Sequence, residues 1–277
     1  MRLFRFRQSS TLEQRAPPNT ARSQIMIKVL EPPPLSGLIR ETRGLLELPR
    51  LMLRFRDLAR QPRGQGQPVL LLPGYGAGDG STVILKSYLR LLGYRVRGWG
   101  LGRNSGDVPD LMPRVLKRIG SFARRTQQEV RLIGWSLGGY LAREAARERP
   151  DLIHRVITLG TPVVGGPKYT VVARRFHRRG IDLAAIEAEI ELRNQISLRT
   201  PVTAIYSRAD AVVAWEACID HNGTDVEHVE VRTTHVGLGF SAEVYKIIAQ
   251  RLADDGKPSC QPSTDVTASQ LGRQHRR

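Results

Sequence analysis

Between residues 67 and 252, short apolar runs alternate with longer amphipathic stretches, and Gly-rich turns separate them. Short continuous apolar runs are typical of strands covered on both faces. The predicted strands are 68–72, 93–99, 129–133, 154–159, 201–206 and 227–232. Helices are expected after Ser81 and over 109–124, 138–148 and 241–252. This order predicts an α/β fold with a mostly parallel, doubly wound sheet, and places a site at the carboxyl ends of the strands.

The segment Gly134-Trp135-Ser136-Leu137-Gly138 lies between a predicted strand and a predicted helix. A Gly-x-Ser-x-Gly sequence in this position is typical of a nucleophile elbow, where a sharp turn exposes the serine hydroxyl above the sheet. The two glycines would let strand and helix approach closely, and the helix N-terminus would favour developing negative charge. The alternative is an ordinary tight turn. We interpret Ser136 as a nucleophile.

A serine nucleophile needs a histidine base and a carboxylate that orients it, in the chain order serine, acid, histidine. Asp210 follows the strand 201–206 and His235 follows the strand 227–232, so both are expected at the same edge of the sheet as Ser136. His154 and His228 instead begin their strands and are expected at the opposite edge. We therefore predict the triad Ser136, Asp210 and His235, against the alternative of solvated loop residues.

Backbone N–H groups are expected to stabilise an oxyanion beside Ser136. One donor would be Leu137, the residue after the nucleophile, and the other would be Tyr75 in the turn that follows the first strand. That Gly-rich turn lacks the spacing and the lysine of a P-loop, so nucleotide binding is not favoured. The chain has two cysteines and no His/Cys cluster, so neither a metal nor another cofactor is expected.

Five segments in this order resemble the α/β-hydrolase superfamily, in particular its bacterial lipase/esterase and GPI-inositol-deacylase-like branch. They are LLPGYGAG, IGWSLGG, ITLGTPVVGG, SRADAVV and THVGLG. Pro73-Gly74 departs from the His-Gly pair usual in that branch. The resemblance implies an α/β-hydrolase sheet with a short cap insertion after the sixth strand, at 163–199. It also implies cleavage of carboxylic esters through an acyl-enzyme intermediate.

Three alternatives remain open: an acyltransferase or a thioesterase of the same fold, and a catalytically silent module that binds anionic membrane surfaces. The insertion 163–199 is either a structural crossover or a mobile cap over an acyl pocket. Trp135, Arg103 and Asn104 are candidates for substrate contact. Stabilisation of a turn is the alternative role for Arg103 and Asn104.

The formal charge of +17 is unevenly distributed. Residues 1–66 hold 13 basic and 5 acidic side chains, so about half of the excess precedes the predicted hydrolase domain at 67–252. We expect a flexible basic arm over 1–34, an amphipathic helical segment over 35–66 with a kink at Pro49, and a disordered tail over 253–277. The preferred interpretation is that the helical segment packs on the domain; contact with an anionic membrane is the alternative.

The expected partner is a small-molecule or lipid ester, with peripheral contact to an anionic membrane as an additional option. No helix-turn-helix, RNP or zinc motif accompanies the positive charge, so nucleic acid is not expected. No signal peptide or transmembrane segment is recognisable, and a cytoplasmic location is expected. The oligomeric state is left open.

Overall fold

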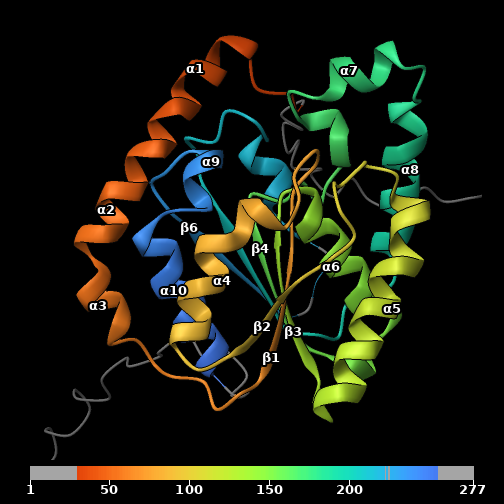
Figure 1. Ribbon diagram of the computed structural model, residues 1–277. Helices are drawn as coiled ribbons and strands as arrows, with labels where there is room; N and C mark the ends of the chain where they lie inside the picture. Colours follow the sequence, from red (N-terminus) through yellow and green to blue (C-terminus); the bar gives the residue numbers. More distant parts are fainter. Residues whose placement is uncertain (1–29, 222, 224, 255–277) are drawn as a thin grey trace, which may run out of the picture.

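A parallel sheet of six strands forms the centre of the computed structural model, which describes residues 30–221, 223 and 225–254 (Figure 1). The strands are β1 (Pro68–Leu72), β2 (Arg95–Gly98), β3 (Val130–Trp135), β4 (Ile153–Leu159), β5 (Val202–Tyr206) and β6 (Val226–Glu230). Their order is β2-β1-β3-β4-β5-β6, and every neighbouring pair is parallel. The predicted α/β class and mostly parallel sheet are confirmed.

Helices cover both faces of this sheet because successive side chains of a strand point to opposite sides. Val69 and Leu71 of β1 pack with α4 (Val83–Leu91) and α10 (Ala242–Ala253) in one buried cluster. Leu70 and Leu72 pack with α5 (Val108–Thr126) and α6 (Leu137–Glu148) in the other. The sheet is therefore doubly wound, as the continuous apolar run of β1 predicted.

The next two strands in the chain lie on opposite sides of β1, with β2 on one side and β3 on the other, so the direction of the strand order reverses at β1. Ligands of open parallel sheets bind at such a switch point, outside the carboxyl ends of the strands. The turn after β1 and the turn from β3 into α6 meet there. The topology thus brings the predicted oxyanion turn next to the predicted elbow.

An N-terminal helical segment, residues 35–59, lies along the α4/α10 side of the molecule (Figure 1). It comprises η1 (Leu35–Gly37), α1 (Leu38–Glu41), η2 (Thr42–Leu46), α2 (Glu47–Leu53) and α3 (Phe55–Ala59). Leu51 and Leu58 are buried in the same cluster as α4 and α10. Residues 1–29 of the expected basic arm and 255–277 of the expected tail lie outside the described residues.

At Pro49, where a kink is expected, the backbone shows no break between helical elements. Pro49 lies in the first turn of α2, which follows the 3₁₀ turn η2 directly. The helical path is interrupted instead at Arg54, between α2 and α3, where the backbone has φ −90° and ψ 5°.

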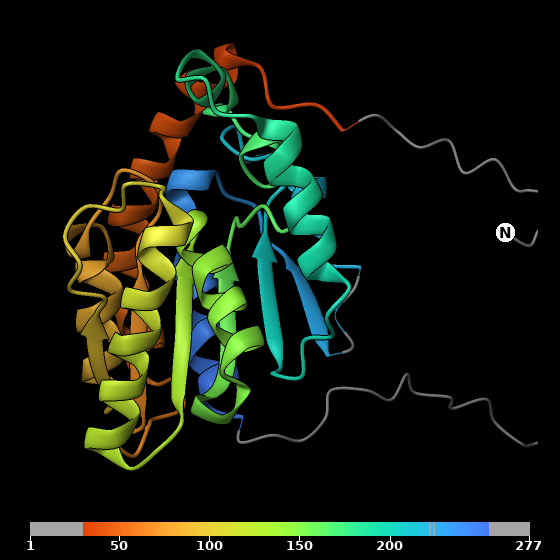
Figure 2. The same ribbon diagram turned by 90° about the vertical axis from the view of Figure 1, so that its right-hand side faces the viewer.

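The insertion 163–199 is expected after the sixth strand, but it follows β4, the fourth strand in chain order. The described residues hold six strands in all and none before β1. It contains η5 (Gly166–Tyr169), α7 (Ala173–Arg178) and α8 (Leu183–Asn194). Figure 2 shows α7 above the carboxyl ends of the strands and α8 beside them. Arg193 of α8 forms ion pairs with Glu144 (2.6 Å) and Glu148 (2.9 Å) of α6.

Candidate active site

Ser136 occupies the sharp turn between β3 and α6 with a positive φ of 54° and ψ −123°. Small neighbours make this turn possible. A Cβ atom on Gly134 would lie 2.3 Å from the carbonyl oxygen of Gly138, and a Cβ on Gly138 would lie 2.2 Å from that of Leu72. Strand and helix therefore approach as closely as the two glycines suggested, and the elbow geometry is present.

Asp210 and His235 come together although 25 residues separate them in the sequence. Asp210 follows β5, and His235 begins α9 (His235–Leu238). The Nδ1 atom of His235 lies 2.6 Å from Oδ2 of Asp210. The other carboxylate oxygen of Asp210 accepts the N–H groups of Val212 and Val213, each at 2.8 Å, which fixes the orientation of the carboxylate.

Two carboxylates raise the pKa of His235. Burial favours the neutral imidazole and by itself would lower the pKa. Asp210, by its charge and its hydrogen bond, and Glu41, by its charge, favour the imidazolium more strongly, so the pKa lies above its ordinary value. His235 is therefore a stronger base than an isolated histidine.

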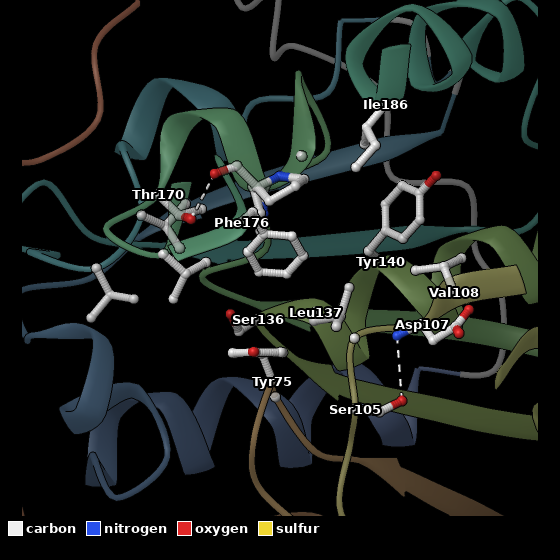
Figure 3. Close-up of a pocket in the computed structure, with 18 of the residues that line it drawn as sticks. Tyr75, Ser105, Asp107, Val108, Ser136, Leu137, Tyr140, Thr170, Phe176 and Ile186 are labelled. Carbon is white, nitrogen blue, oxygen red and sulfur yellow. Dashed lines mark hydrogen bonds between the residues drawn. The ribbon is translucent and has the colours of Figure 1, made fainter. Parts of the chain in front are cut away.

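A cavity of about 610 Å³ opens beside Ser136, and Trp135, Leu137 and His235 line it as well. Most of its wall surface is apolar, and many of its apolar residues come from the insertion 163–199, α5 and α6. They include Val108, Pro109, Tyr140, Phe176, Ile181, Ile186 and Ile190. In Figure 3, Tyr140, Phe176 and Ile186 point into the pocket across from Ser136. Such a cavity suits an apolar chain attached to a polar reacting group.

Tyr75 lies beside Ser136 in the turn after β1 (Figure 3). Among the hydrogen bonds of the described residues, none uses the backbone N–H of Tyr75 or Leu137. The Tyr75 ring packs against Phe176 of α7, with centroids 5.5 Å apart, and its hydroxyl accepts a hydrogen bond from Arg179 at 3.4 Å. The cap thus rests directly on the predicted oxyanion turn.

Arg103 and Asn104 do not line the cavity. Asn104 is fully buried, and its side chain donates to the carbonyl of Pro73 at 2.9 Å and accepts from the N–H of Gly106 at 3.1 Å. Arg103 donates to the carbonyl of Gly76 at 2.7 Å. Their contacts support the turn-stabilising role rather than substrate contact, because both side chains bond to the backbone around the predicted oxyanion turn.

Sequence reasoning missed several residues of this region. Tyr140 could have been found, because it comes four residues after Ser136 on a helix and so shares its face. Phe176 is an isolated aromatic residue in the insertion and carries no local signal. Glu41 lies in the N-terminal helical segment, and its contacts with the triad loops are distant in the sequence.

No family model matches the chain. Two curated proteins, both named pimeloyl-[acyl-carrier protein] methyl ester esterase, are similar to part of it. The protein of Aeromonas hydrophila is 28% identical over 102 residues, covering 35% of this chain and 39% of its own length. The protein of Shewanella woodyi is 30% identical over 104 residues, covering 35% of this chain and 37% of its own length. The chain thus spans under two fifths of the curated relatives it matches.

Solved structures of hydrolases share the fold. One described for the metagenome-derived lipolytic enzymes LipS and LipT has a TM-score of 0.55 at 17% identity and covers 69% of this chain and 94% of its own. Aspergillus fumigatus lipase B has a TM-score of 0.52 at 18% identity, and the match covers 70% of this chain and 53% of the lipase chain. Mouse alpha/beta hydrolase domain-containing protein 10 has a TM-score of 0.50 at 17% identity, and the match covers 70% of this chain and 91% of that protein's chain.

Proposed function

The chain has the α/β-hydrolase fold, and from that premise we propose that it is a serine hydrolase of carboxylic esters, esterase- or lipase-like. The observation that carries the proposal is the convergence of Ser136, His235 and two unused backbone amides on one mostly apolar cavity. The esterases similar to part of the chain and the lipolytic enzymes of the same fold support the same reaction class.

Acylation begins when the Ser136 hydroxyl attacks the carbonyl carbon of the ester. The proton passes to Nε2 of His235, because Nδ1 is held by Asp210. The tetrahedral intermediate then collapses, the bond between the carbonyl carbon and the alcohol oxygen breaks, and the imidazolium gives its proton to the alcohol. His235 next takes a proton from water as the water oxygen attacks the acyl-enzyme. The second tetrahedral intermediate then collapses, the imidazolium returns the proton to Oγ of Ser136, and the acid is released.

Three further groups support these steps. The Asp210 carboxylate holds the imidazole in the required tautomer and stabilises the imidazolium. The N–H groups of Tyr75 and Leu137 stabilise the negative charge on the carbonyl oxygen. Loss of one such donor typically costs about 10²–10³-fold in kcat.

The acyl chain of the substrate occupies the cavity between the cap and the elbow. Phe176, Ile186 and Ile190 of the insertion supply apolar surface there, and Trp135 lies against His235 with ring centroids 6.1 Å apart. The natural ester therefore has an apolar acyl group. An acyltransferase or thioesterase would use the same acyl-enzyme and differ in the molecule that attacks it or in the leaving group.

Peripheral contact with an anionic membrane is the second proposal, and the N-terminal helical segment carries it. Ile39, Leu46 and Leu53 recur at intervals of seven residues and are exposed, at 78%, 56% and 84%. Arg43 and Arg54 are exposed on the same segment. Apolar side chains flanked by arginines suit a surface of anionic lipids. None of the described helices is long and apolar enough to cross a bilayer.

Fluorophosphonate labelling of the full chain tests the catalytic proposal. The probe should label wild-type protein at Ser136, and Ser136→Ala should abolish both the labelling and the hydrolysis of p-nitrophenyl esters. A series of acyl chain lengths with water or an added alcohol or thiol as acceptor separates hydrolase from transferase. Folded protein that neither reacts with the probe nor hydrolyses any of the esters would contradict the proposal.

A further inference from the structure

Glu41 of α1 inserts a carboxylate between the loop that carries Asp210 and the loop that carries His235. Its side chain is buried, with 6% of the residue exposed. Oε1 accepts the backbone N–H of Ala211 at 2.8 Å and that of His235 at 3.2 Å. Oε2 accepts the N–H of Val236 at 2.8 Å. One carboxylate thus bonds to the residue after the acid, to the histidine itself and to the residue after the histidine.

These contacts explain why a carboxylate can be buried here. An ionised carboxylate removed from water is strongly unfavourable unless hydrogen-bond donors satisfy it. Its described partners are three backbone N–H groups, each bonding to a charged acceptor, which makes these bonds stronger than neutral ones. Since two loops distant in the sequence supply the donors, the carboxylate links them.

Gly44 provides a second, independent observation: the N-terminal helical segment packs closely on the loop that carries His235. A Cβ atom on Gly44 would lie 2.6 Å from the backbone nitrogen of Gly237 and 2.6 Å from Oγ1 of Thr234. The η2 turn therefore packs backbone to backbone on α9. Thr234 in turn caps α9 through a hydrogen bond to the N–H of Gly237 at 3.2 Å.

We propose that Glu41 is a positioning residue of the active site. It holds the loop that carries Asp210 and the loop that carries His235 in fixed relative positions, and it places a negative charge near the imidazole. The inference rests on the proposed serine hydrolase. It extends the active site to a helix that precedes the whole sheet in the sequence. Glu41 does not line the cavity and therefore touches no substrate.

Charge and geometry predict separate effects. The charged groups that act on the His235 imidazole are Asp210, from the loop after β5, and Glu41, from α1. Both raise the pKa of His235, so removal of the Glu41 charge lowers it. Loss of a loop contact disturbs the alignment of His235 with Ser136, which lowers kcat and leaves KM nearly unchanged.

Glu41→Gln is the direct test, because it keeps the size of the side chain, removes its charge and replaces one acceptor with a donor. With a p-nitrophenyl ester, kcat should fall about 10- to 100-fold, because misplacement of a reacting group by about 1 Å can cost up to about 100-fold in rate. The acid limb of the kcat/KM profile should move to lower pH. Glu47→Gln is the matched control, because Glu47 is buried in the same segment but pairs with Arg50 at 2.9 Å.

Glu41→Asp keeps the charge and shortens the reach, so kcat should fall while the acid limb stays near its wild-type position. Each rate is divided by the concentration of active sites, measured by complete labelling with a fluorophosphonate probe. Unfolded protein in a sample therefore does not lower the measured kcat. The inference is overturned if Glu41→Gln keeps the wild-type kcat and acid limb, or if Glu47→Gln changes both equally. Failure of Ser136→Ala to abolish activity would instead overturn the proposed function.

Discussion

Ser136 keeps a backbone conformation that few residues with a side chain adopt, and such conformations typically cost about 1–3 kcal/mol. The surrounding structure has to enforce it. Two glycines do so by letting β3, α6 and the end of β1 meet without intervening side chains. At the residue scale, the candidate site therefore depends on glycines without side chains as much as on the proposed triad.

Gly134→Ala tests this dependence. The added methyl group would lie 2.3 Å from the carbonyl oxygen of Gly138, so β3 and α6 must separate. We expect a loss of about 1–3 kcal/mol in the free energy of unfolding, as for other overpacked sites, and slower fluorophosphonate labelling. Gly80→Ala is the control, because a Cβ at Gly80 meets nothing within 4 Å. Equal stability of the two variants would contradict the prediction.

The raised pKa of His235 predicts where activity is lost in acid. As the proposed base, His235 must be neutral, so kcat/KM should fall as pH drops through this pKa, and the fall should begin above the ordinary histidine value of about 6.5. Asp210→Asn removes the stronger of the two charges. It should lower kcat roughly 10³–10⁴-fold and move the acid limb to lower pH. A kcat/KM profile that is flat between about pH 5 and 8 would be inconsistent with this assignment.

At the scale of elements, the cap is attached to the domain at two ends with different chemistry. Arg193 of α8 is bound to Glu144 and Glu148 of α6 by ion pairs. Phe176 and Arg179 contact Tyr75 through one ring packing and one hydrogen bond. Just before α7, the N–H of Val171 donates to the carbonyl of Val212 at 2.9 Å, so the insertion is also bound to the loop after β5. Phe176 lies between this attachment and the predicted oxyanion turn.

Phe176→Ala should therefore change chain-length preference more than basal chemistry. The ring lines the cavity, and burial of a phenylalanine side chain contributes about 1.5–3 kcal/mol. We expect kcat/KM to fall roughly tenfold or more for p-nitrophenyl esters long enough to reach the ring, with little change for the acetate. Leu192→Ala on α8 is the control, because Leu192 is exposed and lies outside the cavity. A uniform fall over all chain lengths would argue against an acyl pocket.

Over the whole molecule, the features that could be predicted from the sequence are those encoded by residues close together in the chain. The apolar run of β1 and the positions of Ser136, Asp210 and His235 at strand ends could be predicted, because each depends on a few neighbouring residues and on parallel topology. Asn104 and Glu41 could not be assigned. Their partners come from other loops, and neither residue type marks a buried site in advance.

The distribution of charge and apolar surface over the whole molecule predicts membrane behaviour. Sedimentation with anionic vesicles should retain the full chain at low salt and release it at high salt, because exposed charges are screened. Replacement of Ile39, Leu46 and Leu53 by serine should weaken binding at least tenfold, because each apolar side chain contributes roughly 1.5–3 kcal/mol when buried. Leu192→Ser is the matched control. Unchanged binding of the triple variant would rule out this face.

The N-terminal helical segment also determines how far the chain can be shortened. The alternation of strands and helices suggests a minimal domain that starts at residue 67. Such a chain would lack Leu51 and Leu58, leave α4 and α10 with uncovered apolar surface, and lose the Glu41 carboxylate. We therefore expect a chain that begins ahead of α1, some thirty residues before the first strand, to be more stable than one that begins at residue 67.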